Sequence, residues 1–451
     1  MNKVLPNDVF NYLEKKSYRD WQLEWDSVSG IEAAIVVPAI CEFENLKTLI
    51  QSLSKNDTDS LKKTLLIFVI NNSVTSDIDV KLNNQNTIKF LRQLNTGDSS
   101  NHLQSEIIKS GLRIGLIDAC SEGCEFNEKL SGVGFARKVG MDLALTTFDY
   151  SIPGKKIIIS LDADCIVDTN YISEIINYFT VNSTSVANIE FEHNFSESKI
   201  NSSGIIAYEI FLRHYVTGLL FAKSPFAFHT VGSTLICDHK AYITAGGMNT
   251  KKAAEDFYFQ QKLAKHFRVE RILTTRVRPS ARESWRVPFG TGRTMMEISS
   301  GEKNIQVYDP DIYLILKNWL ELFYSDLSLN IESLISETKK IHPELFNFLT
   351  NRNFIRDWTN ILENSKSTKQ LNYQRKNLFD AFETLKLAHY LRDKAFPMME
   401  ISPGVKKLFR ILEHNYKLDL ENGNIISDKY LGKLLTEIRS VEFSLYENLN
   451  Q

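Results

Sequence analysis

Two acidic residues, Asp162 and Asp164, stand directly after the apolar run at residues 157–161. Such a run predicts a strand buried on both faces, as in a parallel sheet. Two carboxylates at its end are costly, because they repel each other and lose water on burial. A divalent cation removes both penalties, and oxygen ligands of this kind suit Mg²⁺ or Mn²⁺, which often also hold substrate phosphates. A plain strand end followed by helix caps is the structural alternative.

A second acidic pair, Glu255 and Asp256, follows the glycine pair Gly246 and Gly247. A glycine pair lets the backbone approach a ligand closely. The acids stand at the start of a predicted helix, where they could do chemistry or could complement the positive end of the helix dipole. The residues alone leave both roles open.

A basic tract runs from residue 262 to residue 293, with nine Lys and Arg residues against Glu270 and Glu283. Arginine suits phosphate oxygens, and the tract ends in a loop, residues 288–293, with Arg293 at its tip. A solvated basic face explains the same pattern. Nucleic-acid binding is disfavoured, because the tract lacks interleaved aromatic residues suited to base stacking apart from Trp285.

Composition places the 451-residue chain among ordinary globular proteins, with 43% apolar and 24% charged residues. A formal net charge of −2 does not indicate nucleic-acid binding. No apolar run approaches the roughly 18 residues of a membrane span, and the N-terminus lacks the apolar core of a signal peptide. Five scattered cysteines indicate reduced thiols and a cytoplasmic location. Nothing in the sequence specifies an oligomeric state.

Strands and helices are predicted to alternate along the first part of the chain. Apolar runs predict strands at residues 33–37, 65–70, 114–117 and 155–161. Apolar residues at helical spacing predict helices at residues 46–53, 132–143 and 172–179. This alternation predicts an α/β fold with a mostly parallel sheet, whose ligands sit at the carboxyl ends of the strands. Pro38, Asn71 and Asp162 all fall at such ends.

The remaining stretches complete the predicted organisation. Residues 1–30 form a helical lead-in, with Trp21 and Trp25 packing onto the main domain. Residues 31–299 form the α/β domain, in which the polar stretch 76–110 is interpreted as loop with a short helix. Residues 300–451 form an all-helical region, because apolar residues there recur at helical spacing and no buried strand run appears.

Taken in order, these motifs resemble family 2 glycosyltransferases with the GT-A fold. Val36-Val37-Pro38 with Glu42 and Glu44 is similar to that family's opening strand and "P-x-x-N-E-E" turn, and residues 134–140 are similar to its "A-R-N-x-G" helix. The stretches that resemble its "D-x-D", "G-G-F-x" and "E-D" motifs are residues 162–164, 232–249 and 255–256. The resemblance covers roughly residues 31–295.

The resemblance implies inverting transfer of a sugar from a nucleotide-diphosphate donor to an acceptor hydroxyl of unspecified identity. Asp164, with Asp162, would bind Mn²⁺ or Mg²⁺ at the diphosphate. Asp256 would be the general base, with Glu255 beside it in the same catalytic motif. The residues implied to bind the nucleotide sugar are Pro38, Ala39, Glu42, Asn71, Asn72, Arg137, Asp162, Ala163, Gly246, Gly247 and Arg293.

The sequence departs from that family at several points. Asn71 and Asn72 replace the acid usual after the second strand, and Ile40-Cys41 replaces the usual Tyr-Asn pair. Residues 282–286 do not form the "Q-x-x-R-W" motif of processive polymerases, which disfavours a polysaccharide synthase.

Two other functions compete with sugar transfer. A catalytically silent nucleotide-sugar-binding scaffold would use the helical region for interactions. A phosphohydrolase would use Asp162 as its nucleophile. His229 could touch the sugar or the metal, although a histidine satisfied within a core is favoured. An EF-hand is excluded, because Val167 stands where that loop needs glycine.

Overall fold

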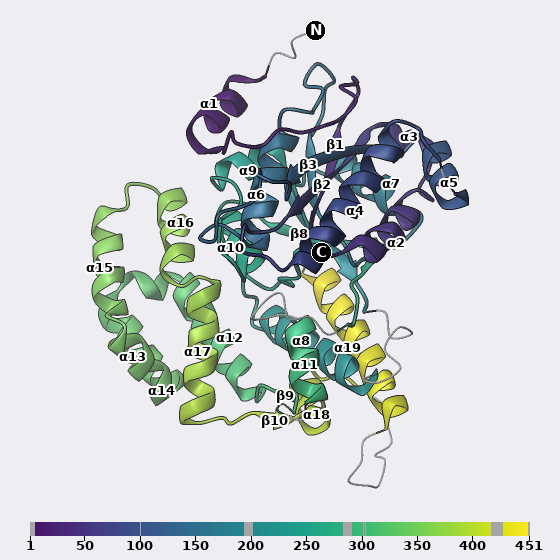
Figure 1. The fold of residues 1–451 in the computed structure, drawn as a ribbon. Coiled ribbons are helices and arrows are strands. Elements are labelled where there is room, and N and C mark those ends of the chain that lie inside the picture. Colours follow the sequence, from purple (N-terminus) through teal and green to yellow (C-terminus); the bar gives the residue numbers. More distant parts are fainter. Residues whose placement is uncertain are drawn as a thin grey trace. The chain divides into compact units, whose positions relative to one another are not determined.

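The computed structural model describes residues 5–99, 101–193, 202–282, 291–300, 302, 304–415 and 427–449 (Figure 1). Contacts between Cα atoms divide the chain into two compact units. The first unit comprises the described residues of Met1–Asn194 and Thr230–Ser280. The second comprises those of Phe195–His229, Ala281–Trp285 and Gly290–Gln451.

The first unit is built on an eight-stranded sheet of mostly parallel strands. Its order is β3 (Arg113–Ala119), β2 (Thr64–Asn71), β1 (Ala33–Ala39), β4 (Ile157–Ser160), β7 (Leu235–Asp238), β6 (Val186–Phe191), β8 (Val269–Arg278) and β5 (Ile166–Val167). Strands β1 to β4 run parallel, whereas β7 runs antiparallel between β4 and β6. Every residue of β1 and β2 is buried, as their apolar runs predict. The expected α/β fold class is confirmed.

Helices fill the connections between these strands. They are α1 (Asn7–Lys16), α2 (Phe43–Leu53), α3 (Thr58–Lys62), α4 (Ile78–Asn95), α5 (His102–Ser110), α6 (Val133–Ala144), α7 (Tyr171–Val181), the 3₁₀ turn η2 (Gly232–Thr234), α9 (His239–Thr244) and α10 (Glu255–His266). The predicted helices at residues 46–53, 132–143 and 172–179 are therefore confirmed as α2, α6 and α7.

The prediction of a loop with one short helix at residues 76–110 is wrong. This stretch forms the 18-residue helix α4 and then α5. Val80, Ile88 and Leu91 lie on one buried face of α4, and that apolar stripe outweighs the many Asn and Gln residues on its other faces.

The N-terminal lead-in packs onto the core of the first unit, as expected. Val9 and Tyr12 of α1 are buried in that core. The Trp21 ring meets the rings of Phe126 and Phe135 edge-on, with centroids 5.0 and 5.5 Å apart. Trp25 packs against the same cluster.

Apart from one two-residue strand pair, the described secondary structure of the second unit is helical. Its elements are α8 (Ser202–Phe221), α11 (Thr291–Ser299), β9 (Gln306–Val307), α12 (Asp311–Tyr324), the 3₁₀ turn η3 (Asp326–Leu329), α13 (Ile331–Ile341), α14 (Pro343–Asn351), α15 (Phe354–Asn364), α16 (Thr368–Leu378), α17 (Ala381–Lys394), β10 (Met399–Glu400), α18 (Ile401–Ile411) and α19 (Asp428–Asn448). None of the helices that the structure describes is both long enough and apolar enough to cross a membrane.

This division differs from the boundary predicted at residues 299 and 300, because α8 and α11 join the second unit. Helix α8 packs along α19, which lies more than two hundred residues later in the chain. Apolar residues of both helices, among them Ile206, Ile210, Leu434 and Ile438, share one buried cluster.

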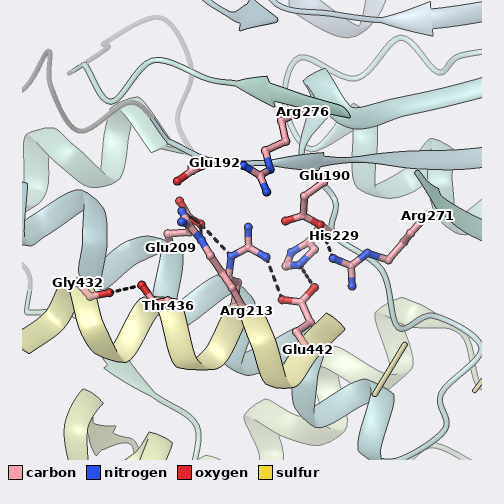
Figure 2. A network of polar contacts seen from close by, with 11 residues as sticks. Glu190, Glu192, Glu209, Arg213, His229, Arg271, Arg276, Gly432, Thr436 and Glu442 are labelled. Carbon is pink, nitrogen blue, oxygen red and sulfur yellow. Dashed lines mark hydrogen bonds and ion pairs between the residues drawn. The ribbon is translucent and has the colours of Figure 1, made fainter. Parts of the chain in front are cut away.

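A buried network of ion pairs also joins α8 to α19. Figure 2 shows Glu209 and Arg213 of α8 beside Glu442 of α19. Arg213 donates to Glu209 at 2.8 Å and to Glu442 at 3.2 Å. Arg439 of α19 is a second donor to Glu209, at 2.6 Å. Both carboxylates are fully buried. His229 completes the network with a 2.7 Å contact between its Nε2 and Glu442.

We predict that Glu442→Ala lowers the free energy of unfolding by about 3 kcal/mol, because it leaves the buried Arg213 and His229 without their shared carboxylate. Urea unfolding followed by circular dichroism measures the loss. Glu447→Ala is the matched control, since it removes an exposed carboxylate from the same helix. Equal stability of the two variants would contradict the prediction.

Candidate active site

Arg137 of α6 joins the two acidic motifs that the sequence singles out. Its Nη2 donates to Asp162 Oδ1, just after β4, and its Nη1 donates to Glu255 Oε1, the first residue of α10. The arginine and Glu255 are both buried. A guanidinium has several donors in a rigid fork, so it can bind two carboxylates at once. The "D-x-D" and "E-D" motifs therefore meet on one side chain.

Asp162 is held from its other side by Ser233 of η2. The Ser233 hydroxyl donates to Asp162 Oδ2 at 2.5 Å, and the Cys165 thiol contacts the same hydroxyl at 3.3 Å. Both oxygens of Asp162 thus have protein partners. Burial raises the pKa of the Cys165 thiol well above its usual value, so this cysteine is a protonated structural group at neutral pH.

Close contact between α6 and the loop at residues 246–254 fixes the position of Glu255. A Cβ atom on Gly134 would lie 2.3 Å from the carbonyl oxygen of Lys251, so only glycine fits there. The Asn249 amide donates to the backbone oxygen of Glu255 at 2.8 Å. Ala254 then enters α10 in the left-handed conformation, with φ at 56°. These contacts place Glu255 against Arg137.

Asp256 follows Glu255 and shares the electrostatic environment of this cluster. Desolvation raises the pKa of its carboxyl, the positive charge of Arg137 lowers it, and the negative charge of Asp162 raises it further. The net direction is upward. A carboxylate with a raised pKa is a better proton acceptor, which suits a general base.

The carboxyl ends of β1 and β2 are fixed by Asn84 of α4. Its Oδ1 accepts from the Cys41 backbone at 2.9 Å, and its Nδ2 donates to Asn71 O and Asn72 Oδ1, both at 3.0 Å. The Asn72 amide donates in turn to Ser73 O. Asn72 is fully buried, so its side chain orders the strand end.

The sequence did not point to Asn84, because residues 76–110 read as loop. The missed signal is its place on the apolar stripe of α4, four residues after Val80 and four before Ile88. A polar residue at a helix position that faces a core is a candidate for an internal hydrogen bond.

The other predicted binding residues near the ends of β1 and β4 differ in how far they are buried. Pro38 and Ala39 end β1, Ala163 is buried, and Asp164 is partly exposed beside it. Glu42 is buried and accepts from the Asn45 amide at 2.6 Å.

The glycine pair belongs to the first unit and Arg293 to the second. Gly246 and Gly247 form a left-handed turn at the start of the 246–254 loop. Arg293 lies in helix α11 of the second unit, not at the tip of a loop as predicted, and its Nε donates to Glu297 at 3.0 Å. The neighbouring residues 283–290 lie outside the described residues. His229 bonds to Glu442 within the second unit, as a core histidine would.

In the described part of the chain, no group of three or more His, Cys, Asp and Glu side chains is arranged to hold a metal ion. Asp162 and Asp164 offer two carboxylates, and that of Asp162 already accepts from Arg137 and Ser233. Mg²⁺ commonly binds one or two carboxylates and completes its shell with water and substrate phosphates. The pair therefore fits an ion that is bound partly by a phosphorylated substrate.

No model of a known protein family matches the sequence, and no curated protein matches it. Among solved structures, the chain is similar to TarS 1-349 of S. aureus in complex with UDP-GlcNAc, at 14% identity and a TM-score of 0.37, over 87% of this chain and 95% of that one. It is also similar to the mannosyltransferase PcManGT of Pyrobaculum calidifontis in complex with GDP-Man and Mn²⁺, at 14% identity and a TM-score of 0.35, over 83% and 93%.

A third similar structure is glucosyl-3-phosphoglycerate synthase of Mycobacterium tuberculosis, in complex with Mn²⁺, UDP and phosphoglyceric acid. The identity is 9% and the TM-score is 0.29, over 58% of this chain and 70% of that one. The descriptions of these three structures name UDP-GlcNAc, GDP-Man and UDP as bound molecules. At these identities and TM-scores the likenesses concern the general fold and carry no argument about the site.

We predict that Arg137→Met costs about 3 kcal/mol of folding free energy, because it leaves the buried Glu255 beside Asp162 without their shared cation. Adding Glu255→Gln should recover part of this loss. Arg92→Met is the control, since Arg92 also bridges two acids, Glu24 and Asp118, but is half exposed. It should cost less than about 1 kcal/mol. Similar losses in both arginine variants, measured by urea unfolding, would refute the prediction.

Proposed function

We propose that the chain is a glycosyltransferase that moves a sugar from a nucleotide-diphosphate donor to a hydroxyl acceptor, with inversion and with a divalent metal ion. The observation that carries this proposal is the shared arginine. Arg137 holds Asp162, at a strand end where ligands of α/β sheets bind, to Glu255, which directly precedes the candidate base. One site would thus combine groups for a diphosphate with a group for an acceptor.

The donor side of this site consists of the strand ends and the two aspartates. Pro38, Ala39 and Asn71 would border the nucleotide. Asp164, with Asp162, would hold Mn²⁺ or Mg²⁺ together with phosphate oxygens. When bound, such an ion offsets the negative charge of the leaving diphosphate. Arg137 keeps Asp162 oriented and compensates its charge.

On the acceptor side, Asp256 would take the proton of the attacking hydroxyl. A bond forms between the acceptor oxygen and the anomeric carbon while the bond from that carbon to the diphosphate oxygen breaks. The electron pair leaves with the nucleoside diphosphate, and the proton goes to the Asp256 carboxylate. Attack on the face opposite the leaving group inverts the anomeric centre. The raised pKa of Asp256 favours this proton transfer.

A catalytically silent nucleotide-sugar-binding protein is the second candidate. It is favoured by the pairing of Asp162, whose two oxygens already have protein partners.

We predict that Asp256→Asn lowers acceptor-dependent release of nucleoside diphosphate by 10²-fold or more, in the range typical of a lost general base, roughly 10²–10⁴-fold. Binding of the donor should persist, because Asp256 lies on the acceptor side. Asp59→Asn, which alters an exposed carboxylate, is the control and should keep wild-type turnover. Full turnover by the Asp256 variant would remove this residue from the mechanism.

The rate should also fall as the pH decreases below the pKa of Asp256, because protonation removes the general base. Because that pKa is raised, the acidic limb of the kcat/KM profile should lie above the range of an ordinary aspartate, near 3.9. Arg137 lowers this pKa, so the residual activity of Arg137→Met should have its acidic limb at still higher pH. A limb that stays in place, or moves to lower pH, would contradict the assignment.

Donor binding should depend on the metal and on Asp164. A nucleotide sugar at 100 times its Kd should stabilise the wild type by about 2.7 kcal/mol, seen as a rise in Tm. EDTA, or Asp164→Asn with Mn²⁺ present, should remove most of that rise. A rise that neither treatment alters would rule out the metal. Binding without turnover across donors and acceptors would favour the silent alternative.

A further inference from the structure

Four buried polar side chains of the first unit form a hydrogen-bonded cluster next to the 246–254 loop. This cluster, called the hub, consists of Tyr12, Lys138, Asp142 and Tyr242. Tyr12 of α1 and Tyr242 of α9 both donate to Asp142 Oδ1, at 2.9 and 2.7 Å. Lys138 donates to Asp142 Oδ2 at 2.7 Å and to the Tyr12 hydroxyl at 3.2 Å. The hub thus connects the N-terminal helix to α6 and α9, which lie near one another in Figure 1.

Burying this set is costly, so its presence calls for an explanation. Burial raises the pKa of Asp142, and the charge of Lys138 acts against that rise. A buried ion pair gains little net stability over apolar packing but enforces one arrangement of its partners. The two tyrosine hydroxyls satisfy the oxygen that Lys138 does not reach. What this hub specifies is the position of three helices relative to one another.

The hub touches the start of the loop at Gly247. A Cβ atom on Gly247 would lie 1.8 Å from the Tyr12 hydroxyl and 3.3 Å from that of Tyr242. Gly246 and Gly247 are both left-handed, with φ at 76° and 75°. The backbone therefore turns directly over the Tyr12 hydroxyl, which a phenylalanine would lack.

The loop that starts on Tyr12 ends on the candidate active site. Its far end packs on Gly134 and leads into Glu255, which Arg137 binds. Arg137 and Lys138 are neighbours on α6, one bonded to the acids of the site and the other to the hub. The two ends of the 246–254 loop are thus both positioned by contacts that lead to helix α6.

We propose that Tyr12 is a positioning residue, whose hydroxyl fixes the start of the 246–254 loop so that Glu255 and Asp256 reach their working places. The lead-in helix is then a working part of the active site. The kinetic part of this inference rests on the proposed function, and the structural part does not.

Hydrogen exchange tests the structural part. In Tyr12→Phe, amides of residues 246–254 should exchange at least several-fold faster than in the wild type, while amides of β1 and β2 keep their rates. Val9→Ala is the matched control, because it removes a core contact of α1 and keeps the Tyr12 hydroxyl. Unchanged exchange in the loop, or equal acceleration in both variants, would overturn the proposal. This result stands even if the protein transfers no sugar.

Kinetics test the functional part. With the donor that supports turnover, Tyr12→Phe should lower kcat about tenfold with the donor KM unchanged, because the base is displaced and the donor side is not. Val9→Ala should keep kcat per folded molecule. Gly247→Ala should lower kcat less in the Tyr12→Phe background than in the wild type, since the clashing hydroxyl is absent. Additive effects, or a wild-type kcat for Tyr12→Phe, would refute the role.

Discussion

The candidate site is organised by one interaction, the contact of the buried Arg137 guanidinium with the carboxylates of Asp162 and Glu255. The buried Glu255 beside the partly exposed Asp162 is unfavourable without a cation, so the arginine helps the strand end after β4 and the start of α10 to lie together. Ser233 orients Asp162 from the other side. The resulting charge distribution also reaches Asp256, whose pKa reflects desolvation first and then the opposing charges of Arg137 and Asp162.

Much of the sheet could be predicted from local pattern, because strands buried on both faces must be apolar throughout. The runs that became β1, β2 and β4 are of this kind, and the acids after β4 were recognisable since nothing in a strand end requires them. Their meeting with Glu255 could not be derived from spacing, because it depends on how α6 and the 246–254 loop pack in three dimensions. The resemblance of ordered motifs suggested it, and the described contacts supply its physical cause.

The misses have a common origin in residues whose role is set by distant partners. The Asn and Gln residues of helix α4 mask a narrow apolar stripe, so the sequence pattern predicts a loop there and does not single out Asn84. Helix α8 was placed with the α/β domain, although its buried charges are matched by α19. The close approach of a ligand at Gly247 stays a prediction, and the structure places the Tyr12 hydroxyl of the lead-in helix beside this glycine.

The most direct test of the central claim compares turnover of the wild type with Arg137→Lys. Lysine keeps the positive charge but cannot bind both carboxylates in a fixed geometry. The measurement is the initial rate of nucleoside diphosphate release from nucleotide sugars with Mn²⁺ and hydroxyl acceptors. The account predicts turnover by the wild type and a loss of about 10²-fold or more in the lysine variant, with its fold retained. Equal rates in the two proteins would contradict it.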